Sequence, residues 1–303
     1  MLKLGIIGSS PGNGHPYSWS AIFNGYEPDA MAECPYPVIP AYLAKQRFPE
    51  DRLANGQVTH IWTQDPENSR HIAQASRIAH VVDNFSDLIG KVDGVLLARD
   101  DAEHHEEMAV PFLRAGMPVY IDKPLALDRQ TERRIFAEER FPGQIYTGTP
   151  LTHAVELMLD SATQEQLGEI RHVHAVTPKY WNTYAVHIIE PVLAYLDLNS
   201  SPVQTEVMRS GEAVILVARW ENGKSATFTV TGSLPAKITF DIFGTDGHEQ
   251  RVFADSFNAF KTSLQRFCTG VQNRQRMFDL KRQSLVTELI ECGSQEMDKA
   301  VRQ

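Results

Sequence analysis

The sequence has few cysteines, no long apolar run and no cluster of basic residues, and each absence excludes a class of protein. Its three cysteines, Cys34, Cys268 and Cys292, are widely spaced, form no metal-ligand pattern and are typical of a reducing cytoplasm. No apolar run approaches the roughly 18 residues that a membrane-spanning helix needs. The formal net charge is −9 and the basic residues are dispersed, so neither a nucleic acid nor an anionic membrane is an expected partner.

The remaining composition is that of an ordinary globular protein. Hydrophobic residues make up 42% and charged residues 22% of the 303 positions, which predicts a full core and about two domains. The chain enters an apolar segment at once, at Leu2–Ile7, and this leaves no room for a signal peptide before it. We therefore expect a cytoplasmic protein.

The stretch from Val92 to Ala126 has the pattern of a strand, a helix and a second strand. An apolar run ends in Arg99–Asp101, helical spacing follows at His104–Ala115, and the apolar run Val119–Ile121 leads to Asp122–Pro124. Two strands joined by a helix through short loops form a parallel βαβ unit. Ligands of open parallel sheets bind beyond the carboxyl ends of the strands, so both polar clusters are expected at a ligand site.

The first strand, Leu2–Ile7, leads into a glycine-bearing turn at Gly8–His15, and Ser18–Asn24 has the pattern of a short helix. Glycines at such a turn let the backbone approach a pyrophosphate at the helix N-terminus. The strict G-x-G-x-x-G spacing is not met, however, so a purely structural joint is the alternative. The candidate phosphate contacts are Gly8, Ser9, Ser10, Gly12 and Asn13.

Lys123 is the strongest single candidate for a functional side chain. It stands at the end of a strand, after an apolar run and between an aspartate and a proline. Partial desolvation makes a lysine there useful for proton transfer. The alternative is a structural ion pair with Asp122. His104 and His105 stand beside two glutamates, but no second ligand lies at i+4, so we expect no metal site and an exposed His105.

The segment Lys179–Pro191 is the second informative stretch. Pro191 is expected in the first turn of a helix, where proline is tolerated, so His187 would stand at or just before the helix start and face a cleft. A neutral imidazole there can take a proton from a substrate hydroxyl. The alternative is a histidine satisfied beneath an aromatic cluster. Aromatic faces beside hydrogen-bonding groups suit a sugar-like ligand, and the candidate substrate contacts are Tyr180, Trp181 and Asn182.

These motifs resemble those of the Gfo/Idh/MocA family of nicotinamide-dependent sugar dehydrogenases. The family has a strand running into Thr-Pro-Asn, a histidine three residues on, and later Glu-Lys-Pro. Here the turn reads Arg99-Asp100-Asp101, the histidine matches His104, and the motif reads Asp122-Lys123-Pro124. The resemblance implies NAD or NADP as the cofactor. Besides the glycine turn, it implies cofactor contacts at Ala98, Arg99, Asp100, His104, Asp122 and Lys123.

In the second stretch the family has Asp-x-Gly-x-His. His187 matches the histidine, whereas Thr183 and Ala185 replace the aspartate and the glycine. The resemblance implies hydride transfer between nicotinamide and a secondary alcohol carbon of a sugar, cyclitol or sugar acid. His187 would be the base, Lys123 would hold the alcohol oxygen, and Thr183 would orient the substrate or His187.

The end of the second strand, Thr59–Thr63, should carry the acid that binds the ribose hydroxyls in an NAD enzyme. Aligning Asp65-Pro66-Glu67 with the family's common Asp-Pro-Glu puts Thr63 at that place, followed by Gln64. Neither side chain would grip both hydroxyls or repel a 2′-phosphate, so NAD and NADP both stay open. We expect Asp65 to cap the helix Glu67–Ser76.

Two further regions complete the prediction. The proline-rich segment 27–57 is longer than the family's connection, and it either flanks the cofactor cleft, makes a subunit contact or is an ordered surface excursion. His153–Ser161 is expected to be helical. After Ser200 the apolar residues alternate, with hairpin turns at Asn222-Gly223 and Asp246-Gly247. Apolar residues recur on both faces of this sheet, which predicts a homo-oligomer, a dimer or a tetramer, through the C-terminal sheet.

The expected fold class is α/β. A doubly wound (Rossmann) parallel sheet over residues 1–123 is followed by an α+β domain with an open, mainly antiparallel sheet over residues 124–303. Two other functions stay open on this fold. One is a nucleotide-binding regulatory protein without turnover, favoured by the altered turns and the missing aspartate at position 183. The other is a different reaction, such as elimination from a sugar with the cofactor recycled.

Overall fold

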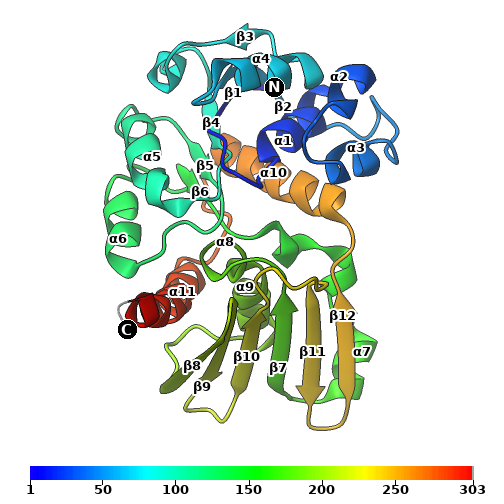
Figure 1. Cartoon of the computed structure of the whole chain (residues 1–303), viewed down its shortest axis with the longest axis vertical. Coiled ribbons are helices and arrows are strands. Elements are labelled where there is room, and N and C mark those ends of the chain that lie inside the picture. Colours follow the sequence, from blue (N-terminus) through cyan, green and yellow to red (C-terminus); the bar gives the residue numbers. More distant parts are fainter. Residues whose placement is uncertain (302–303) are drawn as a thin grey trace. The chain divides into compact units, whose positions relative to one another are not determined.

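The computed structural model describes the backbone of residues 1–301 and the side chains of residues 1–296. Packing divides the chain into two units, which the chain enters more than once (Figure 1). Unit 1 contains residues 1–125, 133–147 and 256–278, and unit 2 contains residues 126–132, 148–255 and those from 279 onward. Each unit is built around a six-stranded sheet, which confirms the expected fold class.

The sheet of unit 1 is entirely parallel and has the order β3-β2-β1-β4-β5-β6. Its strands are β1 (Leu2–Ile7), β2 (Gly56–Trp62), β3 (His80–Val81), β4 (Gly94–Leu97), β5 (Val119–Ile121) and β6 (Ile145–Tyr146). The strand order reverses between β1 and β4, which is the switch point where doubly wound sheets bind ligands. The glycine turn after β1 and the polar cluster after β4 therefore lie at the expected edge.

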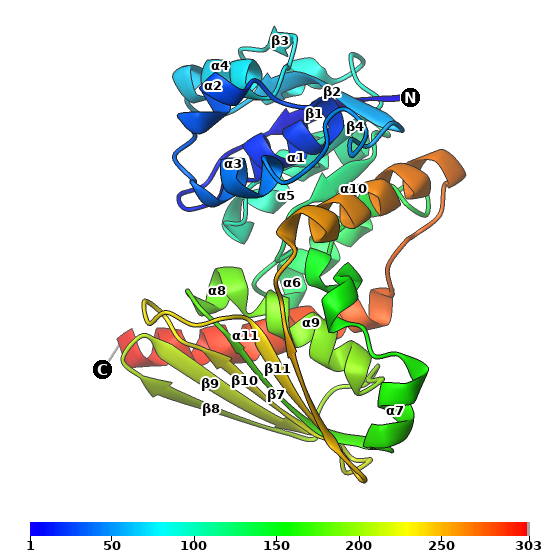
Figure 2. The same cartoon turned by 90° about the vertical axis from the view of Figure 1, so that its right-hand side faces the viewer.

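Helices cover both faces of this sheet (Figures 1 and 2). They are α1 (His15–Asn24), α2 (Pro28–Ala32), α3 (Val38–Leu43), α4 (Pro66–Ala75), α5 (His105–Arg114), α6 (Arg129–Ala137) and α10 (Ser256–Asn273). Residues from β1, α1, β2, α4 and α10 share one hydrophobic cluster. The residues of α1 from Pro16 to Asn24 are all buried, because α1 packs against β2, α4 and α10. This burial fixes where α1 begins and so places the glycine turn.

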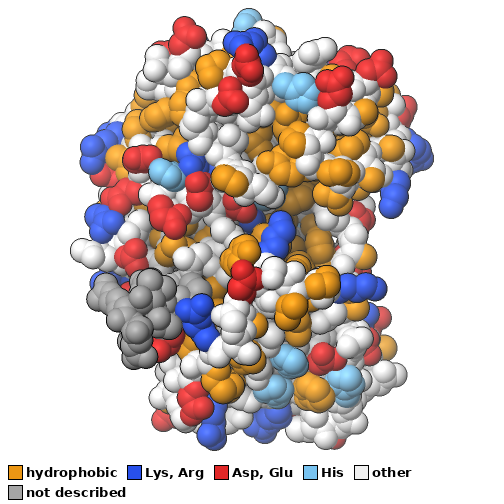
Figure 3. Space-filling model, in the orientation of Figure 1, with side chains coloured by type: hydrophobic (Ala, Val, Ile, Leu, Met, Phe, Trp, Pro, Cys, Tyr) orange, Lys and Arg blue, Asp and Glu red, His pale blue; other side chains and the backbone are white. Residues whose placement is uncertain are grey.

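The proline-rich segment 27–57 is ordered and packs onto α1. Its side chains Met31, Ile39 and Leu43 are buried in the same cluster as α1. Its outer surface stays apolar in part: Val38 is 64% exposed, and Figure 3 shows apolar side chains gathered over α3. The segment is therefore ordered, which leaves the expected alternative of an ordered surface excursion open beside the two functional ones.

The sheet of unit 2 is mixed and has the order β12-β11-β7-β10-β9-β8, with β7 and β10 parallel and the other pairs antiparallel. Its strands are β7 (Ile170–Thr177), β8 (Gln204–Ser210), β9 (Ala213–Arg219), β10 (Ser225–Val230), β11 (Thr239–Gly244) and β12 (His248–Val252). Both predicted hairpin turns are confirmed, because Asn222-Gly223 joins β9 to β10 and Asp246-Gly247 joins β11 to β12.

Helices of unit 2 cover one face of this sheet (Figure 2). They are α7 (Ser161–Leu167), α8 (Trp181–Tyr184), α9 (Val186–Tyr195) and α11 (Leu280–Val301). The helix expected at His153–Ser161 is wrong. Short 3-10 turns at Pro150–His153 and Val155–Leu157 stand before α7, which begins after its cap Asp160. Within residues 1–301, no helix has the length and apolar character needed to cross a membrane.

Candidate functional site

The turn between β1 and α1 depends on two glycines in the left-handed region. Gly8 has φ +82° and Gly12 has φ +79°, values that only glycine adopts without strain. A Cβ on Gly8 would lie 2.9 Å from Cδ of Arg99, whereas a Cβ on Gly12 would meet no atom within 4 Å. The turn is thus tight at its base and open at its exposed tip, where a ligand's phosphate could approach the backbone.

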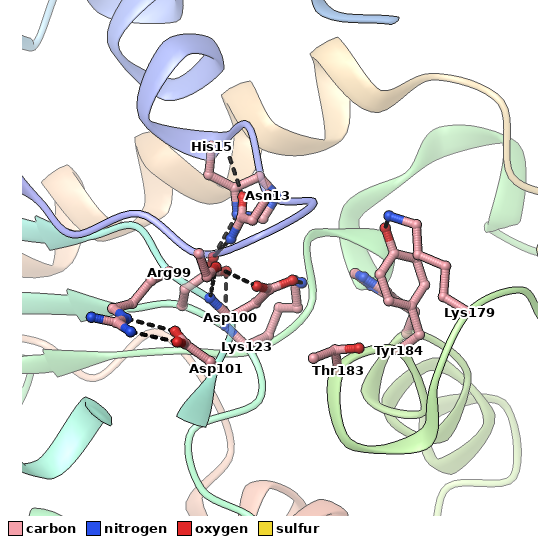
Figure 4. Close-up of polar contacts among 12 residues, drawn as sticks. Asn13, His15, Arg99, Asp100, Asp101, Lys123, Lys179, Thr183 and Tyr184 are labelled. Carbon is pink, nitrogen blue, oxygen red and sulfur yellow. Dashed lines mark hydrogen bonds and ion pairs between the residues drawn. The ribbon is translucent and has the colours of Figure 1, made fainter. Parts of the chain in front are cut away.

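Two buried carboxylates contact side chains of this turn, and Figure 4 shows one of them, Asp100. Asp100 follows β4 and is 7% exposed, and Asp122 follows β5 and is 1% exposed. Ser10 donates from its hydroxyl to Asp100 Oδ1 (2.6 Å), and Asn13 donates from Nδ2 to Asp122 Oδ2 (3.1 Å). The structure thus brings together residues from three loops whose common feature in the sequence is their place after parallel strands.

Lys123 is tied to the first of these carboxylates. Its side chain is 2% exposed and its Nζ donates to Asp100 Oδ2 at 3.3 Å. The expected structural alternative, an ion pair of Lys123 with Asp122, is replaced by this pair with Asp100. Asp122 Oδ1 instead accepts from the Lys123 backbone N–H (2.8 Å). The Lys123–Pro124 peptide bond is cis.

The charges around Asp100 keep it ionised. Burial alone would raise the pKa of its carboxyl, but the Lys123 ammonium, the Ser10 hydroxyl and the His15 imidazole together hold that pKa well below its usual range. An ionised Asp100 in turn stabilises the positive charge of Lys123. The ammonium is therefore held charged and oriented at the carboxyl edge of the sheet.

His15, the first residue of α1, is a member of this cluster that sequence reasoning missed. Its Nδ1 lies 2.5 Å from Asp122 Oδ2. Its ring stacks on Trp19 (centroids 4.9 Å apart, planes at 13°) and meets Phe260 of α10 edge-on. The helix was predicted to begin at Ser18 but begins at His15, and the available signal was a histidine that closes the glycine turn and precedes Pro16. Its partner Asp122 is 107 residues away and could not be found from spacing.

The segment 27–57 lies directly against the turn. A Cβ on Gly14 would be 2.3 Å from Ile39 Cδ1 and 2.7 Å from Tyr36 Cδ2, so only glycine fits beneath these two side chains. Burial raises the pKa of the Tyr36 phenol, and the charges of Cys34 and Asp100 add to this effect. The segment therefore flanks the glycine turn, and its contact with a cofactor stays a prediction.

The end of β2 carries the two predicted ribose contacts. Thr63 is buried and its hydroxyl donates to the backbone carbonyl of Asp65 (2.7 Å). The amide of Gln64 pairs with the backbone of Ser9 through two hydrogen bonds of 3.0 and 2.8 Å. The capping role of Asp65 is confirmed, because its Oδ1 accepts from the Glu67 N–H (2.8 Å). No carboxylate stands at the ribose position itself.

The loop after β4 is held by internal contacts. Ala98 is buried and donates from its backbone to the carbonyl of Ile7 (2.9 Å). Arg99 forms a two-pronged ion pair with Asp101, with one contact of 2.5 Å. His104 is half-exposed, and its Nδ1 lies 2.9 Å from Glu107 Oε1.

The expectation that His105 is exposed is wrong. Its side chain is fully buried. Its Nε2 lies 2.7 Å from the carbonyl oxygen of Arg99 and its Nδ1 lies 3.1 Å from that of Leu125. Because these backbone acceptors belong to the loops after β4 and β5, His105 joins the two loops that carry Asp100 and Lys123.

In unit 2, His187 is held by a residue that sequence reasoning did not identify. Its Nδ1 lies 2.7 Å from Thr149 Oγ1, and the Thr149 backbone N–H donates to Glu190 Oε2 (2.6 Å). Desolvation raises the pKa of the Glu190 carboxyl to about 7. Thr149 thus contacts His187 in the way that an aspartate at position 183 would in the family pattern. This chain has a threonine at position 183.

The expected position of Pro191 is wrong. It lies inside α9, which begins at Val186, and not in the first turn. The helix starts earlier because α8 leads directly into it through Ala185. His187 is therefore in the first turn of α9 and is 6% exposed.

The residues before His187 fall into two groups. Trp181 is 1% exposed and donates from Nε1 to the carbonyl of Ile290 in α11 (2.9 Å), so its ring packs the helices together. Asn182 accepts from Ser294 (2.9 Å). Tyr180 is 54% exposed, and Thr183 bonds only weakly to the Tyr180 carbonyl (3.4 Å). Tyr180 and Thr183 thus remain the better placed candidates for a ligand contact.

Lys179 adds a cation to this stretch. It adopts a left-handed backbone (φ +67°), and its Nζ lies 4.3 Å from the centroid of the Tyr184 ring while it donates to the Tyr184 hydroxyl (Figure 4). Within the part of the chain that the structure describes, no group of three or more His, Cys, Asp or Glu side chains is placed to hold a metal ion.

Comparison with known proteins gives one family and a set of structural neighbours. Residues 36–147 match the model of the Gfo/Idh/MocA oxidoreductase family, NAD-binding Rossmann fold. None of the curated proteins searched matches the sequence significantly. The matched residues begin after the glycine turn, whose pattern differs from that of the family.

Three solved structures illustrate the similarity. The first is myo-inositol 2-dehydrogenase from Lactobacillus plantarum (13% identity, TM-score 0.71, 99% of this chain and 98% of that one). The second is biliverdin reductase from Synechocystis sp. PCC 6803, solved with biliverdin and NADP+ (14%, 0.70, 97% and 98%). The third is UDP-N-acetylglucosamine 3-dehydrogenase from Acidithiobacillus ferrooxidans (12%, 0.68, 97% and 97%). At these identities the neighbours show the fold.

The parallel sheet, the turn after β1 and the matched Rossmann domain define a nucleotide-binding oxidoreductase. Within this chain, residues 36–147 are the part that matches the Gfo/Idh/MocA oxidoreductase family, as an NAD-binding Rossmann domain.

The residues present fit such a cofactor through the open side of Gly12 and the cluster of Lys123, Asp100 and Asp122 beneath the turn.

Proposed function

We propose that this protein transfers a hydride between a nicotinamide cofactor and a secondary alcohol carbon of a sugar, cyclitol or sugar-acid-like substrate. The observation that carries the proposal is the buried Lys123–Asp100 pair at the carboxyl ends of β4 and β5. A charged, oriented ammonium at that edge of a Rossmann sheet is suited to hold an alcohol oxygen beside the nicotinamide. The solved neighbours named for inositol and UDP-N-acetylglucosamine dehydrogenation support this substrate class.

The nicotinamide, when bound, supplies the hydride chemistry. Lys123 would hold the substrate oxygen and stabilise the negative charge that develops on it, while Asp100 keeps the ammonium charged. His187 would take the hydroxyl proton in the oxidising direction. In the tautomer whose Nδ1–H donates to Thr149 Oγ1, Nε2 carries the lone pair that would accept this proton. Thr183 would orient the substrate or His187.

The proposed cofactor contacts are the turn residues and the loops beneath it. Pyrophosphate would meet the backbone near Gly12, since the side chains of Ser10 and Asn13 already donate to Asp100 and Asp122. Thr63 and Gln64 leave both NAD and NADP as candidates, because neither carries the charge that would repel a 2′-phosphate.

A regulatory nucleotide-binding protein without turnover is the second candidate. One observation favours it. Lys123 is 2% exposed and paired with Asp100, so a substrate oxygen would have to enter the buried cluster to contact the ammonium. The test is a screen of sugar alcohols, cyclitols and sugar acids for reduction of NAD+ or NADP+. The enzyme proposal predicts turnover that Lys123→Met and His187→Asn each lower at least about a hundredfold.

A matched control keeps the screen interpretable. His248→Asn alters a half-exposed histidine of β12 that stacks on Phe243 and should leave turnover unchanged. Binding of the cofactor without turnover of any compound, in wild type and variants alike, would favour the regulatory protein over the enzyme.

A further inference from the structure

The formal charges in the cluster beneath the glycine turn do not cancel. Asp100 and Asp122 contribute two negative charges, and Lys123 contributes one positive charge. Arg99 does not restore the balance, because its guanidinium pairs with Asp101. With a neutral His15 the cluster carries one net negative charge, and a dinucleotide would add two more on its pyrophosphate. Like charges at such short range are unfavourable in a buried site.

His15 is placed to correct this imbalance. Asp122 Oδ2 lies 2.5 Å from its Nδ1, so an added proton goes to Nε2. The indole face of Trp19 is stacked on the ring at 4.9 Å, and a cation over a tryptophan face is attracted to it. Both neighbours stabilise an imidazolium, although the small exposure of the side chain (14%) opposes it by desolvation.

A positively charged His15 at this place would attract an anion. His15 is the first residue of α1, a helix of ten residues, and the N-terminal end of a helix repels cations and attracts anions. The nearby donors are engaged within the protein: the backbone N–H of His15 donates to Asn13 Oδ1 (2.8 Å), and Ser10 and Asn13 donate to the two aspartates. Besides the open backbone at Gly12, the charge of His15 is thus a contribution that the turn can make to an anionic ligand.

We propose that His15 is an anion-binding residue of the cofactor site, and that binding of the dinucleotide pyrophosphate is coupled to uptake of one proton by His15. This inference rests on the cofactor site proposed above. Its consequence is that cofactor affinity rises as the pH falls through the range in which histidine takes up its proton.

The groups that face His15 come from four elements. Asp122, after β5, contacts His15 directly. Asp100, after β4, is paired with Lys123. Helix α10 contributes the uncharged ring of Phe260. Tyr36 of the segment over Gly14 has a raised pKa and so stays neutral. Asp100 stays ionised at any pH near neutrality. Histidine is the residue type among them whose charge ordinarily changes between pH 5 and 8.

The experiment is a fluorescence titration of the full-length protein with NADH between pH 5.5 and 8.5 at constant ionic strength. NADH is the probe because its pyrophosphate keeps its charge over this range, whereas the 2′-phosphate of NADPH does not. The proposal predicts that the Kd rises with pH, by up to about tenfold per unit on the steepest part of the curve. His15→Gln should bind NADH with a pH-independent Kd close to the weak, high-pH limit of wild type.

His248→Gln is the matched control and should keep the wild-type curve. A flat wild-type curve, or an unchanged slope in His15→Gln, would overturn the inference while leaving the cofactor site intact. Absence of NADH binding at every pH, with NADPH also failing to bind, would instead remove the proposed function on which it rests. If only NADPH binds, the pH dependence of its Kd is compared between wild type and His15→Gln instead, and the difference between the two curves tests the same inference.

A second measurement does not depend on the variant folding. Histidine imidazole NMR of the wild-type protein follows protonation of His15 with and without NADH. The proposal predicts that NADH shifts the titration midpoint of one histidine, the one whose signal is missing from His15→Gln, to higher pH by about half a unit or more. A midpoint that NADH leaves unmoved would overturn it.

Discussion

The hydroxyl oxygen of Thr149 lies 2.7 Å from Nδ1 of His187, and these two residues are 38 positions apart in the sequence. Thr149 stands just after β6 and is 1% exposed, with its backbone bonded to Glu190. Thr149, a buried threonine of unit 2, is thus placed to orient His187. The resemblance would assign this role to an aspartate at position 183.

The first prediction concerns this contact. Thr149→Val keeps the shape of the side chain but removes the hydroxyl, so His187 loses the partner that fixes its tautomer. We expect kcat to fall about tenfold, the value of one orienting hydrogen bond, with little change in KM. Thr149→Ser keeps the hydroxyl and should retain most of kcat. Steady-state kinetics on the best substrate from the alcohol screen decides this, and equal losses in both variants would contradict it.

The second prediction concerns Glu190. Its pKa is raised from the usual 4.5 to about 7, so between these values the folded protein holds a proton that the unfolded chain has released. The free energy of unfolding should therefore fall as the pH rises through this window, by about 1–3 kcal/mol from this group. Urea unfolding at pH 5 and pH 8 measures the fall.

Glu190→Gln should reduce this pH dependence, because an amide cannot ionise. Glu221→Gln, on the exposed turn between β9 and β10, is the control and should leave it unchanged. A wild-type stability that does not fall from pH 5 to pH 8, or a fall of equal size in Glu190→Gln, would contradict the assignment.

The third prediction concerns the Lys123–Asp100 pair. Asp100→Asn leaves a buried ammonium without its carboxylate, which should lower the free energy of unfolding by about 3–5 kcal/mol at pH 7. Adding Lys123→Met should recover part of the loss, because the second change removes the uncompensated charge. Since the pKa of Asp100 is depressed below its usual 3.8, the stability that it contributes is present above that pH and lost as the pH falls below it. Additive losses in the double variant would contradict the pairing.

The fourth prediction concerns self-association. The open face of the unit 2 sheet carries Ile215 and Val217 of β9, half-buried, and Phe243 of β11, which is 40% exposed. We propose that a second copy of the chain covers this face, as the recurrence of apolar residues on both faces predicts. Val217→Asp should then convert a dimer or tetramer into monomers by light scattering after gel filtration. A wild-type protein that is monomeric at micromolar concentration would contradict this proposal.

Much of the fold could be predicted from local patterns. The strand, helix and strand of residues 92–126 follow from apolar periodicity, from Gly116 and from short joints, and the two hairpin turns of unit 2 follow from Asn222-Gly223 and Asp246-Gly247. The membership of helix α10 in unit 1 could not be predicted in this way. That placement depends on packing of Phe257 and Phe267 into a core built from residues 2–146, which no local pattern encodes.

The candidate site, too, could be predicted from local patterns only in part. The polar residues after β4 and β5 could be placed at one edge because parallel strands end together. Their partners could not be predicted, because His15 meets Asp122 across 107 residues and Thr149, the cap of a short 3-10 turn, meets His187 across 38 residues. The expected exposure of His105 is wrong because its ring lies against two backbone carbonyls of other loops, which its own neighbours in the sequence do not reveal.

The most direct test of the account is a paired titration of the purified protein with NADH and NADPH, followed by nicotinamide fluorescence. We expect saturable binding of at least one of them, and the preferred one shows what Thr63 and Gln64 permit at the ribose. If neither binds at millimolar concentration and neither co-purifies, the assignment of the glycine turn and the Lys123 cluster to a nicotinamide cofactor is contradicted.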